Sequence, residues 1–286
     1  MYFKSGSDKI YYQVFGKENE TAIVFLHGVG MDHSTFIEQA DALKAGYRVI
    51  LLDLPGHGKS SELDKNNDFS GKTAEQVIDL LDYLEIDRVI MVGQSLGSFI
   101  VQKAAAKYPD RILASVHLGG GSLYPGYPSI IKVFKPFTML TISLMPEKFL
   151  YKKFARHKAY KSETQQYLEE VTSANGKKII TDLTLEMIND MSSGIPEPLD
   201  HNILLLYGEH ELNFIKNLSL KWHESHDRSK LAEIKDAHHI ANQDNPEKFN
   251  EAIESFLREC ECVGQRDKVQ KDKLSEDKIK SAASVE

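Results

Sequence analysis

The chain contains only two cysteines among its 286 residues, Cys260 and Cys262, both near the C-terminus. A disulfide framework requires more cysteines at wider spacings, and one Cys-x-Cys pair supplies at most half of a zinc site. We therefore interpret both side chains as reduced thiols.

The sequence also lacks a long uninterrupted apolar run. A membrane-spanning helix needs about 20 consecutive apolar residues, and the nearest stretch, 137–145, is too short. The first nine residues contain no apolar segment typical of a secretory signal. These features predict a cytoplasmic protein without stable membrane insertion.

An excess of basic residues is missing as well. The formal net charge is −7 and the pI is about 5.9, whereas nucleic-acid-binding proteins usually carry clustered positive charge. We therefore expect no nucleic-acid partner. The length allows one large core with an insertion, or two small domains, and the sequence does not indicate an oligomeric state.

Seven segments have the apolar character of strands, and several are continuously apolar, as expected for strands buried on both faces. They are residues 10–15, 22–27, 47–52, 88–92, 113–118, 203–207 and 231–234. Helical patterns separate them: a capping box of Thr73 with Gln76 predicts the start of one helix, and Pro246 predicts the start of the last. The alternation predicts an α/β fold with a mostly parallel sheet flanked by helices.

The alternation stops between residues 122 and 198, where prolines and long polar helical runs replace the strands. We interpret this part as an inserted helical cap and assign the core to residues 1–121 and 199–262. Residues 263–286 have mixed charges and no aromatic residue, which predicts a disordered tail.

The first half of the insertion is rich in apolar side chains. They are Ile130, Ile131, Val133, Phe134, Phe137, Met139, Leu140, Ile142, Leu144 and Met145. Such a surface needs a partner, and we consider three: the core, an apolar substrate pocket, or a membrane surface.

The most informative segment is Gly93-Gln94-Ser95-Leu96-Gly97, which separates an apolar run from an alanine-rich run. The pattern Gly-x-Ser-x-Gly is typical of a sharp strand–turn–helix connection, in which the glycines make room for a strained apex. The serine hydroxyl then stands clear of the sheet. This context predicts Ser95 as a nucleophile.

A serine hydroxyl is a poor nucleophile without a base, and the base needs an orienting acid. His238 and His239 are the candidate bases, because they follow the last predicted strand at the carboxyl edge of the sheet.

The acid is expected in the loop after the strand at 203–207. We favour Glu211, with Glu209 in the same loop and Asp200 before the strand as alternatives. The earlier loop after residue 118 reads Gly119-Gly120-Gly121-Ser122 and offers no carboxylate.

Two backbone N–H groups are predicted to stabilise the developing oxyanion. One belongs to Leu96, at the start of the helix after Ser95, where the helix dipole helps. The other belongs to Val29, in the glycine-containing loop His27-Gly28-Val29-Gly30. We interpret His27 as a structural residue that holds this loop by hydrogen bonds.

Three further motifs are incomplete. Gly58-Lys59-Ser60 lacks the first glycine of a phosphate loop, and Gly28-Val29-Gly30 lacks the third glycine of a dinucleotide-binding fingerprint. His223 and His226 are one residue too close for the zinc-protease pattern. We therefore predict no cofactor and no metal.

Taken together, these residues resemble the α/β-hydrolase superfamily over most of the chain, from about Ile10 to Leu257. Four blocks carry the resemblance in the expected order: His27-Gly28, Asp53 to Ser60, the segment 93–97, and Ala237-x-His239 before Asn245-Pro246. The resemblance implies an eight-stranded sheet, a helical cap after the sixth strand and a Ser-acid-His triad.

The chain departs from the family pattern at two positions. The family usually has Asp at the acid position, where this chain has Glu211. The family commonly has Gly at the position of His238, which selects His239 as the base and leaves His238 as a possible pocket residue.

The sequence thus predicts a cofactor-independent serine hydrolase that acts on a small molecule. The preferred substrate is a small or medium apolar ester, cleaved through an acyl-enzyme. Thioester, lactone or carbon–carbon bond hydrolysis uses the same groups, and fold and triad do not set the substrate. A hydrolase-like ligand-binding protein with negligible turnover is a further alternative.

Overall fold

The computed structural model describes residues 1–62, 68–128 and 133–260. The strands are β1 (Tyr2–Ser5), β2 (Asp8–Phe15), β3 (Ala22–Leu26), β4 (Arg48–Leu52), β5 (Val89–Gln94), β6 (Ile112–Leu118), β7 (Asn202–Gly208) and β8 (Ser229–Ile234). The helices are α1 (Ile37–Leu43), α2 (Phe69–Tyr83), α3 (Leu96–Lys107), α4 (Phe134–Leu144), α5 (Glu147–Lys158), α6 (Ser162–Asn175), α7 (Lys177–Ser193), α8 (Asn213–Glu224), α9 (Ala241–Asp244) and α10 (Pro246–Glu259). Two short 3-10 helices are η1 (His33–Phe36) and η2 (Pro109–Arg111).

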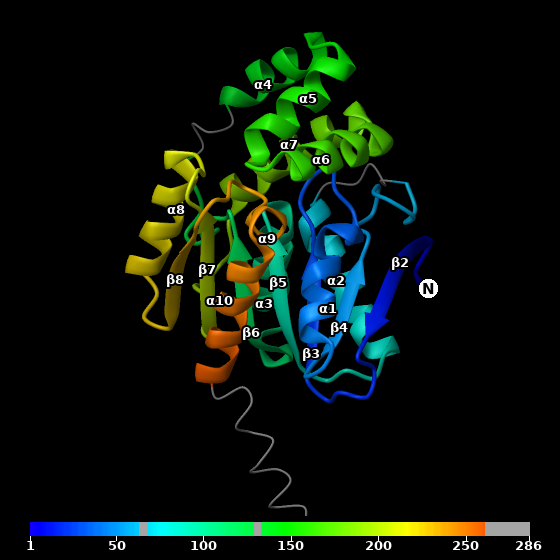
Figure 1. The fold of residues 1–286 in the computed structure, drawn as a ribbon, viewed down its shortest axis with the longest axis vertical. Coiled ribbons are helices and arrows are strands. Elements are labelled where there is room, and N and C mark those ends of the chain that lie inside the picture. Colours follow the sequence, from blue (N-terminus) through cyan, green and yellow to red (C-terminus); the bar gives the residue numbers. More distant parts are fainter. Residues whose placement is uncertain (63–67, 129–132, 261–286) are drawn as a thin grey trace, which may run out of the picture.

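The strands form one sheet of eight in the order β1-β2-β4-β3-β5-β6-β7-β8 (Figure 1). The pairs β1–β2 and β2–β4 are antiparallel, and every other neighbouring pair is parallel. The predicted fold class, a mostly parallel eight-stranded sheet flanked by helices, is confirmed. In such a sheet the carboxyl ends of the parallel strands lie along one edge, where ligands bind.

Two details of the sequence prediction are wrong. Strand β1 was not expected, because its side chains at the sheet edge are only half-buried or exposed and produce no apolar run. The helix predicted to begin at Thr73 begins at Phe69 instead, and the carboxylate of Asp68 accepts a hydrogen bond from the N–H of Gly71 (3.2 Å). Thr73 is buried inside the helix.

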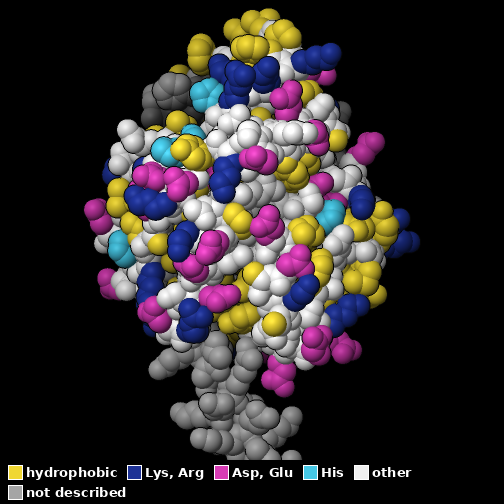
Figure 2. Space-filling model, viewed as in Figure 1, with side chains coloured by type: hydrophobic (Ala, Val, Ile, Leu, Met, Phe, Trp, Pro, Cys, Tyr) yellow, Lys and Arg dark blue, Asp and Glu magenta, His cyan; other side chains and the backbone are white. Residues whose placement is uncertain are grey.

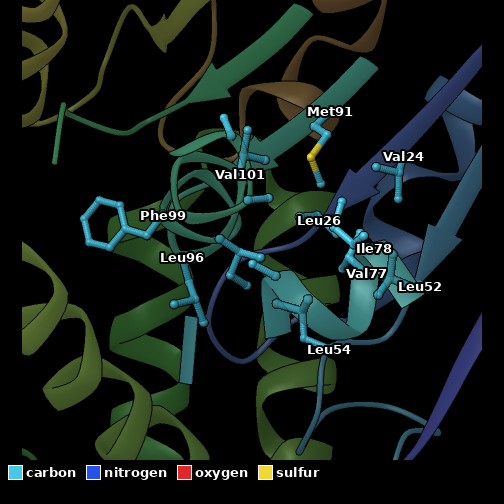
Figure 3. Close-up of a cluster of buried hydrophobic side chains, with 14 of the residues drawn as sticks. Val24, Leu26, Leu52, Leu54, Val77, Ile78, Met91, Leu96, Phe99 and Val101 are labelled. Carbon is cyan, nitrogen blue, oxygen red and sulfur yellow. The ribbon is translucent and has the colours of Figure 1, made fainter. Parts of the chain in front are cut away.

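Apolar side chains fill both faces of the sheet. Helices α2, α3 and α8 contribute to the cluster on one face, and α1 and α10 contribute to the cluster on the other (Figure 1). Figure 3 shows part of the first cluster, in which Val24, Leu26 and Met91 of the sheet meet Val77 and Ile78 of α2. Burial of one such side chain contributes about 1.5–3 kcal/mol, so these contacts fix the strands that carry the site.

In the described residues between β6 and β7 the chain forms the α-helices α4 to α7, which we call the cap helices. They lie within the predicted range 122–198 and cover one end of the sheet (Figure 1). A separate apolar cluster of Met31, Ala155, Ala159, Leu168, Val171 and Ile240 joins α5 and α6 to two loops of the sheet. This cluster holds the lower part of the cap in place.

Helix α4 does not pack as the sequence led us to expect. Val133, Phe137, Leu140 and Leu144 are spaced along one stripe and are 65%, 70%, 58% and 74% exposed, so packing on the core is wrong for these residues. Ile142 and Met145 do pack against the core. Hydrophobic side chains gather at the top of the molecule, over the cap helices (Figure 2).

Several predicted features lie outside the described residues, namely Ile130, Ile131, Cys262 and the tail at 263–286. Among the helices that the structure describes, none combines the length and the hydropathy required to cross a bilayer.

Candidate active site

Ser95 occupies a sharp connection between β5 and α3, as the sequence predicted. Its backbone dihedral angles are φ 53° and ψ −111°, a strained combination for a residue with a side chain. A Cβ atom on Gly97 would collide with the carbonyl oxygen of Leu26, and one on Gly93 would collide with the carbonyl group of Gly97. Both glycines are therefore required for α3 to start so close to β3 and β5.

His239 and Glu211 form a buried pair. The Nδ1 atom of His239 lies 2.5 Å from the Oε2 atom of Glu211, and the Oε1 atom of Glu211 accepts the N–H of Leu212 at 2.8 Å. A Cβ atom on Gly119 would lie 2.8 Å from the imidazole of His239 and 3.3 Å from Oε2 of Glu211. The loop after β6, which the sequence analysis noted for its missing carboxylate, thus makes room for the pair.

The electrostatic environment keeps this pair in one protonation state. Burial disfavours the charged form of Glu211, but the charge and hydrogen bond of His239, the charge of Lys158 and the N–H of Leu212 outweigh it and lower its pKa to about 2. Burial is the largest influence on His239 and lowers its pKa below the ordinary 6.5, against the attraction of Glu211. At neutral pH a neutral imidazole therefore donates its Nδ1 proton to a carboxylate, which leaves Nε2 as an acceptor.

Ser95 and His239 line the same cavity, whose volume is about 270 Å³. The Nε2 atom of His239 is buried and has no hydrogen-bond partner among the described residues. The described residues therefore include no hydrogen bond between the Nε2 atom of His239 and the hydroxyl of Ser95. Such contacts are often long in ligand-free enzymes and shorten when substrate binds.

The remaining walls of the cavity are mostly apolar. The apolar residues are Val29, Met31, Phe154, Met187 and Ile240, and the other polar residues are Gln94, Lys158 and Thr184. The cap contributes through α5 and α7. A pocket-lining role was considered for the apolar stretch at 130–145, and its described side chains, those of residues 133 and 135–145, are not among the lining residues. A larger hollow of about 1010 Å³ lies at the opposite edge of the sheet, around Arg88, and includes neither Ser95 nor His239.

Of the two predicted oxyanion donors, Val29 lines this cavity, and Leu96 directly follows Ser95, which also lines it. Leu96 is the first residue of α3, so its N–H has no partner within the helix. Val29 lines the cavity, and its N–H has no hydrogen-bond partner in the described part of the chain. Both groups are therefore available to a ligand.

Two buried histidines hold the loop that contains Val29. The Nε2 atom of His27 accepts the N–H of Leu54 (3.0 Å), in agreement with the structural role expected for His27. The Nε2 atom of His57 accepts the N–H of Gly30 (3.0 Å). Burial lowers the pKa of His57 to about 3, so it remains a neutral acceptor at physiological pH.

The sequence analysis missed two residues that connect the cap to this region. The side chain of Asn175, at the end of α6, donates to the carbonyl oxygens of Gly30 (3.0 Å) and Met31 (3.1 Å). The fully buried carboxylate of Asp244 accepts the N–H groups of Tyr160 (2.9 Å) and Lys161 (3.0 Å), which precede α6. No local pattern marks either residue, because their partners are distant in sequence.

Asp244 also reaches the histidine loop. Its Oδ2 atom accepts the N–H of His238 (2.9 Å), and the Nδ1 atom of His238 accepts the N–H of His239 (2.9 Å). His238, which the sequence left as a possible pocket residue, is not among the residues that line this cavity. Gln94 completes the connection, since its amide lies 3.4 Å from the carbonyl oxygen of His239.

One group of side chains has the composition of a metal site. Asp32, His33 and Asp53 offer donor atoms within 4.8 Å of one another. Oδ1 of Asp53, however, already accepts both the backbone N–H and the ring Nδ1 of His33 at 2.7 Å, and Oδ2 accepts the N–H of Lys59 at 2.8 Å. We therefore interpret the cluster as structural, because these hydrogen bonds connect the neighbouring turns to each other.

A sequence model of the alpha/beta hydrolase fold matches residues 21–197, which is more than half of the chain. The chain belongs to the α/β-hydrolase family. The family resemblance drawn from the sequence motifs is thereby confirmed.

Curated relatives in this family match parts of the chain. It is 38% identical over 118 residues to a 2-hydroxy-6-oxononadienedioate/2-hydroxy-6-oxononatrienedioate hydrolase of Burkholderia vietnamiensis, covering 40% of this chain and 41% of the relative. Its identity to the Escherichia coli enzyme of that name is 31% over 156 residues, or 50% of this chain and 54% of the relative. The chain spans about half the length of the curated relatives it matches.

Solved structures of α/β-hydrolases match nearly the whole chain. An esterase from Thermogutta terrifontis has a TM-score of 0.69 at 18% identity, covering 91% of this chain and 98% of the esterase. An enol-lactonase from Burkholderia xenovorans has a TM-score of 0.68 at 20% identity, covering 91% and 100%. At this identity the likeness concerns the fold alone.

Proposed function

We propose that this α/β-hydrolase is a cofactor-independent serine hydrolase, most simply a carboxylesterase for small or medium apolar esters. Ser95 is the nucleophile, His239 the general base and Glu211 the acid that orients it. The observation that carries the proposal is the buried 2.5 Å contact between Nδ1 of His239 and Oε2 of Glu211, together with the fact that His239 and Ser95 line one cavity.

The proposed reaction has two half-reactions. The Nε2 atom of His239 takes the proton of Ser95, the serine oxygen attacks the carbonyl carbon, and the imidazolium then returns the proton to the departing alcohol. Water hydrolyses the resulting acyl-enzyme by the same route. Glu211 holds the Nδ1 proton in place and stabilises the imidazolium that forms in each step.

The tetrahedral intermediates carry a negative oxygen, which the N–H groups of Leu96 and Val29 stabilise. Both lack protein partners in the described structure, and α3 adds the positive end of its dipole at Leu96. A donor in such a position is typically worth about 2.7–4 kcal/mol in the transition state.

The cavity supports a small substrate. Its volume of about 270 Å³ lies just below the range of about 300–1,000 Å³ typical of sites for drug-sized ligands. Five of its lining residues have apolar side chains, which favours a substrate with a short hydrocarbon chain. The names of the relatives, which include an enol-lactonase and oxononadienedioate hydrolases, keep lactone and carbon–carbon bond hydrolysis as second candidates for the same three groups.

Labelling combined with turnover tests the proposal. A fluorophosphonate should attach to Ser95 of the wild-type protein, located by peptide mass spectrometry, and the unlabelled protein should hydrolyse short 4-nitrophenyl esters repeatedly. Labelling without turnover on a panel of esters, thioesters and lactones would favour the ligand-binding alternative. No labelling of Ser95 would contradict the assignment of the nucleophile.

The pH dependence of the rate follows from the lowered pKa of His239. Only the neutral imidazole can accept the proton of Ser95, and burial shifts its protonation below pH 6.5. We therefore expect the decline of kcat/KM for a neutral ester at low pH to have its midpoint below pH 6.5. A pH–rate profile between about pH 4 and about pH 9 measures this limb, and a midpoint above 6.5 would contradict the assignment.

A further inference from the structure

Lys158 is a charged residue in the cavity to which the proposed reaction gives no role. It is the last residue of α5, and it lines the same wall as Ser95 and His239. Its carbonyl oxygen accepts the N–H of Ile240 (3.0 Å), the residue that follows His239. This bond fixes the backbone of Lys158 beside the histidine loop.

The ammonium group of Lys158 has no hydrogen bond or ion pair with any residue that the structure describes. The charge of Glu211 acts on Lys158, but both oxygens of Glu211 are already engaged by His239 and Leu212. An ammonium carries three donors, and because Lys158 is only half-buried, these donors remain available to a molecule that enters the cavity. Burial accordingly lowers the pKa of Lys158.

We infer that Lys158 binds a carboxylate of the substrate, so that the favoured substrates are esters or lactones that also carry an anionic group. This inference rests on the proposed hydrolase function and narrows its substrate class. The apolar walls formed by Val29, Phe154 and Met187 would hold the hydrocarbon between the two ends of such a molecule.

The charge of Lys158 is poorly suited to assist the base directly. A cation at this place lowers the pKa of His239 and so opposes the imidazolium that acyl transfer requires. A carboxylate bound to Lys158 offsets that charge. An anionic substrate should therefore bind more tightly, and it should also make proton transfer from Ser95 to His239 easier.

The test compares two esters that differ only at the far end of the acyl chain, 4-nitrophenyl hexanoate and mono-4-nitrophenyl adipate. We expect the wild-type protein to favour the adipate about 10-fold or more in kcat/KM, in line with a charge-assisted hydrogen bond. Lys158→Met should lower the ratio of kcat/KM for the adipate to kcat/KM for the hexanoate by about 10- to 100-fold, chiefly through a higher KM for the adipate. Lys158→Arg should restore part of the preference.

Lys153→Met is the matched control, because Lys153 is exposed on the same helix; neither rate should change. Thermal unfolding reports on a purely structural role. Lys158→Met should unfold at the same or a higher temperature, because it replaces a half-buried charge by an apolar side chain of similar length. A marked loss of stability would instead indicate that Lys158 serves to neutralise Glu211.

The outcomes separate the two proposals. If the wild-type protein hydrolyses both esters equally well, or Lys158→Met slows both to the same extent, Lys158 does not select a carboxylate, and the serine mechanism is unaffected. The wild-type comparison needs no variant and is informative even if Lys158→Met fails to fold. If neither ester is turned over and Ser95 resists fluorophosphonate, the hydrolase proposal itself fails.

Discussion

Ser95→Ala should lower kcat for 4-nitrophenyl hexanoate by about 10⁴- to 10⁶-fold, because alanine has no oxygen to form the acyl-enzyme. The sharp connection between β5 and α3 should keep its shape, because the strain at this position is in the backbone and Gly93 and Gly97 still leave room for it. Steady-state rates and thermal unfolding, measured on the same preparations, test both parts of this expectation.

Ser173→Ala provides the control, because Ser173 is exposed on α6 and does not line the cavity. It should retain the wild-type rate. A Ser95→Ala protein that keeps full activity would remove Ser95 from the reaction. A variant that is inactive and also unfolded would leave the rate uninterpretable, and Ser95→Cys, which preserves a nucleophile at the same position, would then be compared by fluorophosphonate or iodoacetamide labelling.

Glu211→Gln should lower kcat/KM by about 10³- to 10⁴-fold, an effect of the size seen when the acid of a Ser-His-Asp triad is replaced by its amide. The amide can present an N–H to Nδ1, which favours the tautomer in which Nε2 carries the proton and cannot act as a base. The amide also no longer stabilises the imidazolium. The measurement is the rate with the neutral hexanoate ester, which carries no carboxylate for Lys158 to bind.

Glu209→Gln is the informative comparison, because Glu209 lies two residues away and was an alternative for the same role. Its side chain is 35% exposed and accepts hydrogen bonds from Lys235 (3.3 Å) and the N–H of Asp236 (3.1 Å), not from His239. Its replacement should change the rate less than about threefold. The reverse result, with Glu209→Gln inactive and Glu211→Gln active, would move the acid to position 209.

The sheet was predictable because its inner strands are uniformly buried. All five residues of β3 and all six of β5 are buried, and continuous apolar runs are the sequence signature of strands covered on both faces. The last helix was equally clear: Pro246 begins α10, the side chain of Asn245 accepts the N–H of Lys248 (3.3 Å), and the apolar stripe is buried. Edge strand β1 lacks such a pattern and was missed.

The candidate site was predictable where each residue follows directly from a strand. Ser95 comes after β5, Glu211 after β7 and His239 after β8, so parallel strands alone place all three at one edge. The choice between Glu211 and Glu209 needed the loop geometry. The N–H of Glu209 donates to the carbonyl oxygen of Ile234 in β8, which directs Glu209 toward that strand. Lys158 was not predictable, because its position depends on how the cap packs over the sheet.

The buried carboxylate of Asp244 has a consequence for how this protein can be recombined with its relatives. One side chain accepts two N–H groups from the chain before α6 and a third from the loop of His239. A chimera whose foreign cap did not place two N–H groups at this point would leave the buried carboxylate of Asp244 with the N–H of His238 as its remaining donor among these three. The cap and the loop that contains His239 should therefore be exchanged together. Grafts intended to change substrate specificity should preserve residues 158–161 together with Asp244.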